Sequence, residues 1–207
     1  RLRVIRQNLT AYLTLFLGVL MASFLLFFGL MLSPLLDHFK GEVLDSEIAA
    51  YQYILKVPVE TSADDAEKYA VLSLENPNGE EITVYGISEN SGYFSASIPE
   101  GEVLLSDGYM EKYGVRQGDS VTLTKKYTED SYDFTVDASY HYPATLALFM
   151  NIDDFRKMFD KDENYFSGYF SDQKLNDIDD SLVSTIITER DLTTVADQLS
   201  DSMSKSF

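Results

Sequence analysis

An uninterrupted apolar run begins close to the N-terminus. Residues 11–33 read AYLTLFLGVLMASFLLFFGLMLS, and no charged residue occurs from position 7 to position 36. A helix of this length extends roughly 34 Å at ~1.5 Å per residue, slightly more than the ~30 Å hydrocarbon core of a bilayer. The pattern therefore predicts a transmembrane helix over residues 11–36. A secretory signal peptide is the alternative, but its apolar region is shorter, at about 7 to 15 residues.

Three basic residues precede the apolar run. Arg1, Arg3 and Arg6 stand there without an acidic neighbour. An excess of Lys and Arg beside a span marks the cytoplasmic side of the membrane. We therefore expect residues 1–10 to form a cytoplasmic flank whose arginines fix the topology. The predicted location is the cell membrane, with the N-terminus cytoplasmic and the main domain extracellular.

Small residues inside the run share one helix face. Ala11, Gly18, Ala22, Gly29 and Ser33 follow one another at intervals of 7, 4, 7 and 4 residues. These intervals are near-multiples of the ~3.6-residue helical turn, so the five residues fall on one side. Helices in lipid pack closely through such residues, because lipid gives no hydrophobic gain on association. The pattern favours a span packed on other transmembrane helices over a lone tether.

Apolar residues at helical spacing also flank the remainder of the chain. They are Leu44, Ile48, Tyr51 and Leu55 on the membrane side, and Leu192, Leu199 and Met203 at the C-terminal end. The spacing predicts a stalk helix over 37–56 and an outgoing stalk helix over 188–207. We expect the two to pair as a stalk that leads back to the membrane. The alternative is a final helix that packs on its own domain.

Short strand patterns alternate with short helical patterns between these stalks. Asn-Pro-Asn-Gly at 76–79 predicts a tight hairpin between strands at 70–74 and 82–86. A strand at 102–105 precedes a short helix that reaches Tyr113 and is closed by Gly114, and residues 120–124 form a further strand. The predicted outcome is a mixed α+β extracellular domain over residues 57–187.

The second half of this domain repeats the arrangement. An apolar strand at 146–150 leads to Asn151 as the helix cap, with Phe155, Met158 and Phe159 as the buried helix face. The sequence after it predicts a strand at 164–170, a polar helix at 174–183 and a strand at 186–187.

Charge is distributed as unevenly as hydrophobicity. Residues 37–207 hold all 34 acidic residues but only 13 of the 16 basic ones, which gives this part a net charge of −21. Such a domain is repelled by nucleic acid, whose phosphates require clustered Lys and Arg, and by an anionic bilayer surface. The absence of cysteine excludes thiolate metal sites, iron–sulfur clusters and disulfides.

No residue pattern predicts catalysis or metal binding. His38 and His141 are too few and too far apart in sequence for a zinc site. Asp160, Asp162 and Asn164 begin like a calcium loop, but Tyr165 stands where that loop requires Gly. A serine nucleophile elbow and a phosphate-binding loop are both missing from the sequence. We therefore expect no enzyme, no metal site and no cofactor bound by this chain.

Aromatic residues of the second half are predicted to pack in the core. They are Tyr140, Tyr142, Tyr165, Phe166, Tyr169 and Phe170. The alternative is that they line a site for a peptide or a lipid.

One segment carries a family resemblance. Residues 101–123, GEVLLSDGYMEKYGVRQGDSVTL, resemble a signature of the extracytoplasmic domain of FtsX-like and MacB-like ABC transporter permeases, and residues 151–155 are similar to a second unit of that domain. The order of basic flank, span, stalk, domain and outgoing helix matches as well. The resemblance implies a MacB-like core domain and a bacterial source. Because such permeases have at least four spans, it also implies that this chain is a fragment with one span.

The resemblance implies a function as a permease element that transmits ATP-driven change to an extracellular domain. The resemblance further implies a role in lipid or peptide export or resistance. ATP then binds to a separate cytoplasmic ABC ATPase. The other expected partners are membrane lipid, sister transmembrane helices of the permease and an extracellular peptide, lipid or protein. The alternative function is a single-pass receptor or adhesion module that the span merely anchors. A tethered hydrolase is a third candidate, but the sequence offers no plausible catalytic group for it.

Overall fold

The computed structural model describes residues 9–45, 47–128, 130–188, 190, 191, 194 and 198. The chain divides into two compact units. One contains the N-terminal helix up to Gly41, and the other spans Glu42–Thr194. Arg1, Arg3 and Arg6 lie outside the described residues, as do Leu192, Leu199 and Met203.

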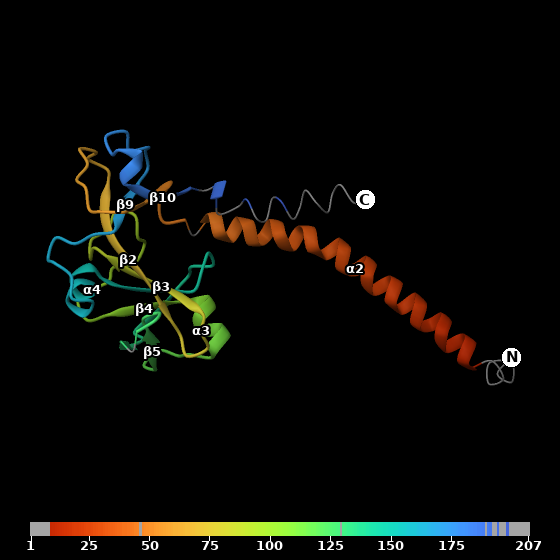
Figure 1. Cartoon of the computed structure of the whole chain (residues 1–207). Coiled ribbons are helices and arrows are strands. Elements are labelled where there is room, and N and C mark those ends of the chain that lie inside the picture. The colour runs from red at the N-terminus through yellow and green to blue at the C-terminus, as the bar shows by residue number, and fades with distance from the viewer. Residues whose placement is uncertain are drawn as a thin grey trace. The chain divides into compact units, whose positions relative to one another are not determined.

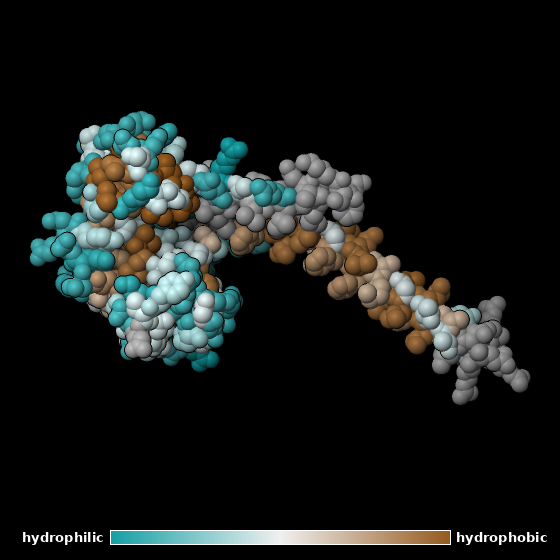
Figure 2. All heavy atoms as spheres, viewed as in Figure 1, coloured by the Kyte–Doolittle hydropathy of each residue, from teal (hydrophilic) through white to brown (hydrophobic). Residues whose placement is uncertain are grey.

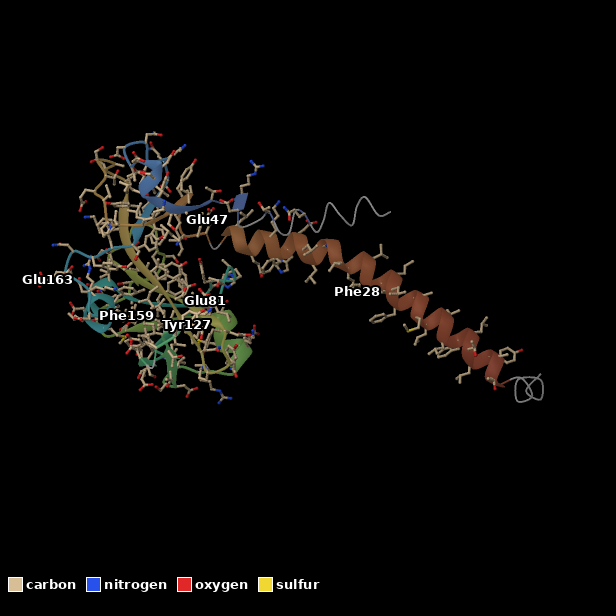
Figure 3. The ribbon with its side chains drawn as sticks, in the orientation of Figure 1. Phe28, Glu47, Glu81, Tyr127, Phe159 and Glu163 are labelled. Atoms are coloured by element: carbon tan, nitrogen blue, oxygen red, sulfur yellow. The ribbon has the colours of Figure 1, made fainter. Side chains whose placement is uncertain are left out.

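The N-terminal helix, α2 (Leu9–Asp45), is a single element of 37 residues that continues through Pro34. It is long and apolar enough to cross a membrane, and none of its most apolar window is buried by protein. Its visible side in Figure 2 is largely hydrophobic, and Phe28 projects from it with 59% of its surface exposed (Figure 3). At ~1.5 Å per residue α2 is about 55 Å long, so it exceeds the ~30 Å core of a bilayer.

The predicted stalk helix over 37–56 is wrong beyond Asp45. Residues Tyr51–Leu55 form strand β1, which pairs with β9 (Gly168–Ser171) on one side and β10 (Val183–Thr188) on the other. Leu55 is buried in the domain, as is Ile48 in the segment before β1. These residues form a strand despite their helical spacing. Strands on both sides of β1 pair with its backbone through hydrogen bonds, and the sheet buries its aromatic and β-branched side chains.

The domain is α+β, as the sequence predicted, and ten strands of the described residues form one sheet (Figure 1). The strands not yet named are β2 (Glu67–Glu75), β3 (Glu81–Ile87), β4 (Val103–Ser106), β5 (Ser120–Thr124), β6 (Ser131–Thr135), β7 (Ala138–Tyr140) and β8 (Ala147–Asn151). Their order is β10-β1-β9-β2-β3-β8-β4-β7, while β5 pairs with β2 and β6. The β3–β8 and β4–β7 pairs are parallel, and the other pairs are antiparallel.

The hairpin predicted around Asn76 is confirmed as the β2–β3 turn. Leu74 pairs with Ile82, and Gly79 has a φ of +77°, which suits glycine. The side-chain Oδ1 of Asn76 accepts hydrogen bonds from the backbone N–H groups of Asn78 and Glu80, at 2.9 and 3.0 Å. The amide of Asn76 therefore holds the turn that its position in the sequence predicted.

Both predicted strand–helix units are present. Helix α3 (Asp107–Tyr113) follows β4 and ends at Gly114 in the left-handed conformation. Helix α4 (Ile152–Met158) follows β8, and Oδ1 of its cap Asn151 accepts from the backbone N–H of Asp153 at 2.9 Å. Ser106 is at the N-cap position of α3, but its hydroxyl instead accepts from the backbone N–H of Ala147.

Two predictions for the second half are corrected. Met158 is 38% exposed, so it does not belong to the buried face of α4. The expected helix over 174–183 is reduced to a 3₁₀ turn, η1 (Asp180–Leu182), because Asp177 instead accepts hydrogen bonds from Thr61 and Ser62 in a neighbouring loop. These contacts lower the pKa of Asp177 to about 2, the backbone N–H of Ser62 being the main cause.

The sheet separates two apolar layers. One layer contains α3, α4 and the β5–β6 hairpin, and its buried members include Leu105, Phe134 and Phe155. The other contains Tyr85, Phe149 and Tyr142, together with Phe94 and Ile98 from the loop after β3. A third, smaller cluster includes Tyr53 of β1 and Tyr169 of β9.

Packing of α4 on β3 gives the first prediction. A Cβ at Gly86 of β3 would lie 2.8 Å from Cβ of Phe155, a contact closer than packed atoms allow. Gly86→Ala should therefore lower the free energy of unfolding by about 1–3 kcal/mol, the usual cost of overpacking a core. The free energy of unfolding can be measured by titrating the full chain in lipid nanodiscs with urea and monitoring the near-UV circular dichroism of tyrosine.

Gly108→Ala in α3 is the matched control. Apart from the adjoining residues and backbone of α3 itself, a Cβ there would meet no described atom within 4 Å. The substitution should leave stability unchanged or raise it by up to about 1 kcal/mol. Equal losses in the two variants would contradict the packing argument.

Candidate functional site

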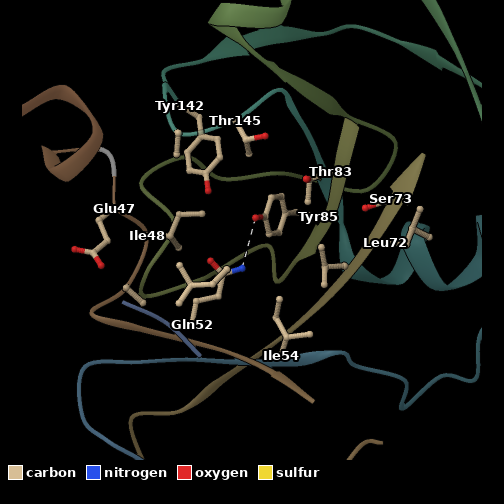
Figure 4. Close-up of a pocket in the computed structure, with 14 residues that line it drawn as sticks. Glu47, Ile48, Gln52, Ile54, Leu72, Ser73, Thr83, Tyr85, Tyr142 and Thr145 are labelled. Carbon is tan, nitrogen blue, oxygen red and sulfur yellow. Dashed lines mark hydrogen bonds between the residues drawn. The ribbon is translucent and has the colours of Figure 1, made fainter. Parts of the chain in front are cut away.

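A pocket of ≈ 480 Å³ opens on the Tyr85 side of the sheet (Figure 4). Strands β1, β2, β3 and β10 contribute to it, together with residues 47–49 before β1 and residues 142–145 before β8. Its wall is mainly apolar and includes Ile48, Ile54 and Ile187, whereas Gln52, Tyr85 and Tyr142 supply polar groups. The volume lies within the range of about 300–1,000 Å³ that small-molecule sites occupy.

A close approach of strands β1 and β9 lies beside the pocket. Gly168 of β9 pairs with Ile54 of β1 and with Tyr69 of β2. A Cβ at Gly168 would lie 1.7 Å from the carbonyl oxygen of Tyr53, so only glycine fits. The ring of Tyr69 stacks on Phe170 with centroids 4.2 Å apart, and its hydroxyl donates to the carbonyl oxygen of Tyr53 at 3.0 Å.

Gln52 connects this arrangement to the pocket. Its amide Nε2 donates to the hydroxyl oxygen of Tyr69 at 3.2 Å and to that of Tyr85 at 3.5 Å. The second of these contacts is the dashed line in Figure 4. Gln52 is only 8% exposed, so its amide is a buried polar group that requires hydrogen-bond partners. The two tyrosines provide partners for its nitrogen.

Two phenol groups around the pocket, those of Tyr69 and Tyr142, have raised pKa values. Burial raises the pKa of Tyr69 and that of Tyr142, in the latter case aided by the nearby Tyr85. The rings of Tyr85 and Tyr142 meet edge to face, with centroids 6.3 Å apart. Tyr142 also packs edge to face on Phe149, with centroids 5.3 Å apart. These contacts hold Tyr142 as a fixed part of the pocket wall.

The loop that carries Tyr142 is fastened to the start of α3. His141 Nδ1 lies 2.5 Å from Oδ2 of Asp107, and Oδ1 of Asp107 accepts from the backbone N–H groups of Gly108 and Tyr142. The contact with Asp107 raises the pKa of His141. Burial alone would raise the pKa of Asp107, but hydrogen bonds from His141, Gly108 and Tyr142 outweigh it and lower that pKa. The pair thus favours an ionised carboxylate beside a protonated imidazole.

The chemistry of the pocket suits binding. Hydroxyl, phenol and amide groups line it together with one carboxylate, that of Glu47. Within the described ranges, no group of three or more His, Cys, Asp or Glu residues is arranged to hold a metal ion. His141 is engaged with Asp107 in the domain, whereas His38 belongs to α2.

The structure places the predicted helix-packing residues along α2. Ala11, Gly18 and Ala22 are exposed, Gly29 is half-buried, and the side chain of Ser33 lies outside the described residues. Apart from the adjoining residues and backbone of α2 itself, no described atom lies within 4 Å of a Cβ built on Gly18. Leu44 is the one predicted stalk residue that is part of α2.

The aromatic residues divide between core and pocket. Phe166, Tyr169 and Phe170 are buried in the core, as expected. Tyr142 is also buried, but it lines the pocket as well. Sequence reasoning missed Gln52, although an amide within the otherwise apolar run Tyr-Gln-Tyr-Ile-Leu was a usable signal once that run was assigned to a strand.

No family model matches the chain, and no curated protein matches it.

The His141–Asp107 contact predicts a pH-dependent stability. Because the folded pKa of His141 is above its ordinary value of 6.5, the stabilisation is present below pH 6.5 and is lost as the pH rises through the folded pKa. His141→Gln should therefore lower the Tm of the domain at pH 5.5 and have much less effect at pH 9. Thermal scans of the full chain, followed by tyrosine circular dichroism, measure the difference.

Asp107→Asn is the matched control. It keeps an oxygen for the backbone N–H groups of Gly108 and Tyr142 but removes the charge that His141 meets. The double variant should lose no more stability at pH 5.5 than the more destabilised single variant, because the two substitutions remove the same interaction. Additive losses would show that the two side chains act independently.

Proposed function

We propose that this chain is a permease element of an ABC transporter, in which a membrane helix transmits movement to an extracellular domain. The observation that carries the proposal is α2, a single helix over Leu9–Asp45 that is long and apolar enough to cross a membrane. Its length exceeds the bilayer core by about 25 Å, so its C-terminal turns stand outside the membrane. The resemblance of residues 101–123 to permease domains and the small-residue face of α2 also support it.

The physical basis of the proposed mechanism is the stiffness of a hydrogen-bonded helix. Closure of cytoplasmic ATPase subunits on ATP shifts the spans against which the small-residue face is packed. A helix transmits displacement along its axis because successive turns are hydrogen-bonded, and in α2 this ladder lacks the bond that the N–H of residue 34 would donate, since Pro34 has none. Only the five residues 46–50 separate the end of α2 at Asp45 from the start of β1 at Tyr51. In the proposed mechanism this short linker passes the displacement of the helix to the strand.

A membrane-anchored receptor is the second candidate function. The pocket favours it, because its volume and its mixed wall are those of a ligand site. In a receptor the span needs no sister helices. The two candidates therefore differ in what the small-residue face contacts.

The proposed orientation can be tested with one introduced cysteine, because the chain has none of its own. Tyr127 is 94% exposed at the β5–β6 hairpin and is labelled in Figure 3. In intact bacteria producing the full chain, Tyr127→Cys should react with a membrane-impermeant maleimide. Gln7→Cys, in the predicted cytoplasmic flank, should react only after the cells are permeabilised. The reverse pattern would overturn the orientation.

The small-residue face predicts the behaviour of a double variant. Gly18→Leu with Gly29→Leu should separate α2 from its sister spans, because two large side chains replace the closest points of contact. ATP-hydrolysing activity that copurifies with the full chain from membranes in mild detergent should then fall at least tenfold. The domain should remain folded, as measured by its circular dichroism.

Leu20→Phe with Met31→Phe is the matched control, since it enlarges two side chains at the same 11-residue spacing on the opposite face of α2. Copurified activity should stay near that of the wild type. The receptor is favoured over the permease if the wild-type chain retains no ATP-hydrolysing partner, or if both double variants retain it equally.

A further inference from the structure

The hydrogen bonds of Tyr69 fix the orientation of the Gln52 amide. A tyrosine hydroxyl has one hydrogen, and that of Tyr69 is donated to the carbonyl oxygen of Tyr53 at 3.0 Å. The oxygen of Tyr69 can then only accept, so the group of Gln52 that faces it must be the NH₂ group. The amide oxygen Oε1 consequently points away from Tyr69. The hydrogen-bond network thus determines which end of the Gln52 amide is the oxygen, because the reversed amide would place two acceptors against each other.

The oxygen of Gln52 is the group that a ligand would meet. In the described part of the chain, Gln52 makes side-chain hydrogen bonds only through Nε2. Among the described side chains, two polar atoms are fully buried and have no hydrogen-bond partner: Glu67 Oε1 and Asn76 Nδ2. Gln52 Oε1 is not one of them, so it retains some contact with solvent. An acceptor on a side chain that is 92% buried therefore opens into the pocket that Gln52 lines. A bound molecule must offer it a hydrogen-bond donor.

The charges around the pocket decide which kind of donor fits. Glu47 is the one charged residue among the described residues of the wall, so Lys and Arg are both absent from it. The chain from residue 37 onward has a net charge of −21, which repels anions and attracts cations. Tyr85 and Tyr142 add phenol oxygens to the wall, which can accept hydrogen bonds from an ammonium group. An amine meets all of these conditions.

The apolar part of the wall indicates the chemistry of the rest of the ligand. Ile54, Val71 and Ile187 come from three different strands and supply a surface for a hydrocarbon or aromatic body. We propose that the pocket binds a small amphipathic amine, whose ammonium group donates to Gln52 Oε1 while its apolar body contacts these three residues. The proposal depends on the pocket alone, so it does not rest on the proposed permease function.

Three probes of one shape test the proposal. They are phenethylamine, 2-phenylethanol and 3-phenylpropanoate, which carry a cationic, a neutral and an anionic head on the same phenyl group. Saturation-transfer NMR titrations use the full chain in nanodiscs of zwitterionic lipid, with empty nanodiscs subtracted. Phenethylamine should bind the wild-type chain at least tenfold more tightly than the carboxylate, and the alcohol should fall between them.

Two variants assign the binding to the pocket. Gln52→Leu should weaken phenethylamine binding roughly tenfold, because it removes the acceptor but keeps much of the shape. Gln117→Leu, the same change at an exposed turn residue, should leave binding unaltered. Ala144→Phe places a large ring in the half-buried loop at the pocket wall and should abolish binding even if Gln52→Leu fails to fold.

The proposal is overturned if the carboxylate binds as tightly as the amine, or if a folded Gln52→Leu variant binds like the wild type. Unaltered binding in Ala144→Phe would overturn it too, since the probe would then sit elsewhere. Loss of amine binding in Gln52→Leu and Ala144→Phe, with retention in Gln117→Leu, would support it. The permease proposal is tested separately by the copurification of ATP hydrolysis.

Discussion

The close approach of β9 to β1 at Gly168 is the constraint on which the rest of the domain depends. With a side chain at this position, a Cβ would overlap the carbonyl oxygen of Tyr53 at 1.7 Å, and the two strands could not pair. Strand β9 is also the neighbour of β2, so it joins β1 and β10 to the larger part of the sheet. The ring of Tyr69 also lies against Gly168, with Cε1 3.1 Å from where that Cβ would be, and its hydroxyl donates to the carbonyl oxygen of Tyr53. The same approach therefore orients Gln52 and shapes the pocket.

Local signals predicted the local elements well. The hairpin at Asn76–Gly79, the left-handed Gly114 and the Asn151 cap each depend on residues within a few positions of one another, and the structure contains all three. The interaction that decides each element is present in the sequence segment itself. For the same reason the apolar helix was identified from its run of residues, although its end at Asp45 was not.

Elements that depend on distant partners were predicted less well. The spacing of Ile48, Tyr51 and Leu55 suits a helix, yet β1 is held by residues more than a hundred positions further along the chain. Residues 174–183 look helical, but Asp177 bonds to Ser62 instead of to its own turn. The pocket was beyond prediction for the same reason. Its wall combines β1, β2, β3 and β10, and Gln52 faces it only because Tyr51–Leu55 is a strand.

The segment that follows α2 also forms part of the pocket wall. Glu47, Ile48 and Ala49 belong to the short segment between α2 and β1, and all three line the pocket. A ligand in the pocket and a displacement of the helix therefore act on the same few residues. Linkage makes any such effect reciprocal: if movement of the helix changes the affinity of the pocket, occupancy of the pocket changes the free energy of that movement by the same amount. In the proposed permease, recognition of the ligand and transmission of the movement would use the same segment and the same strand, β1.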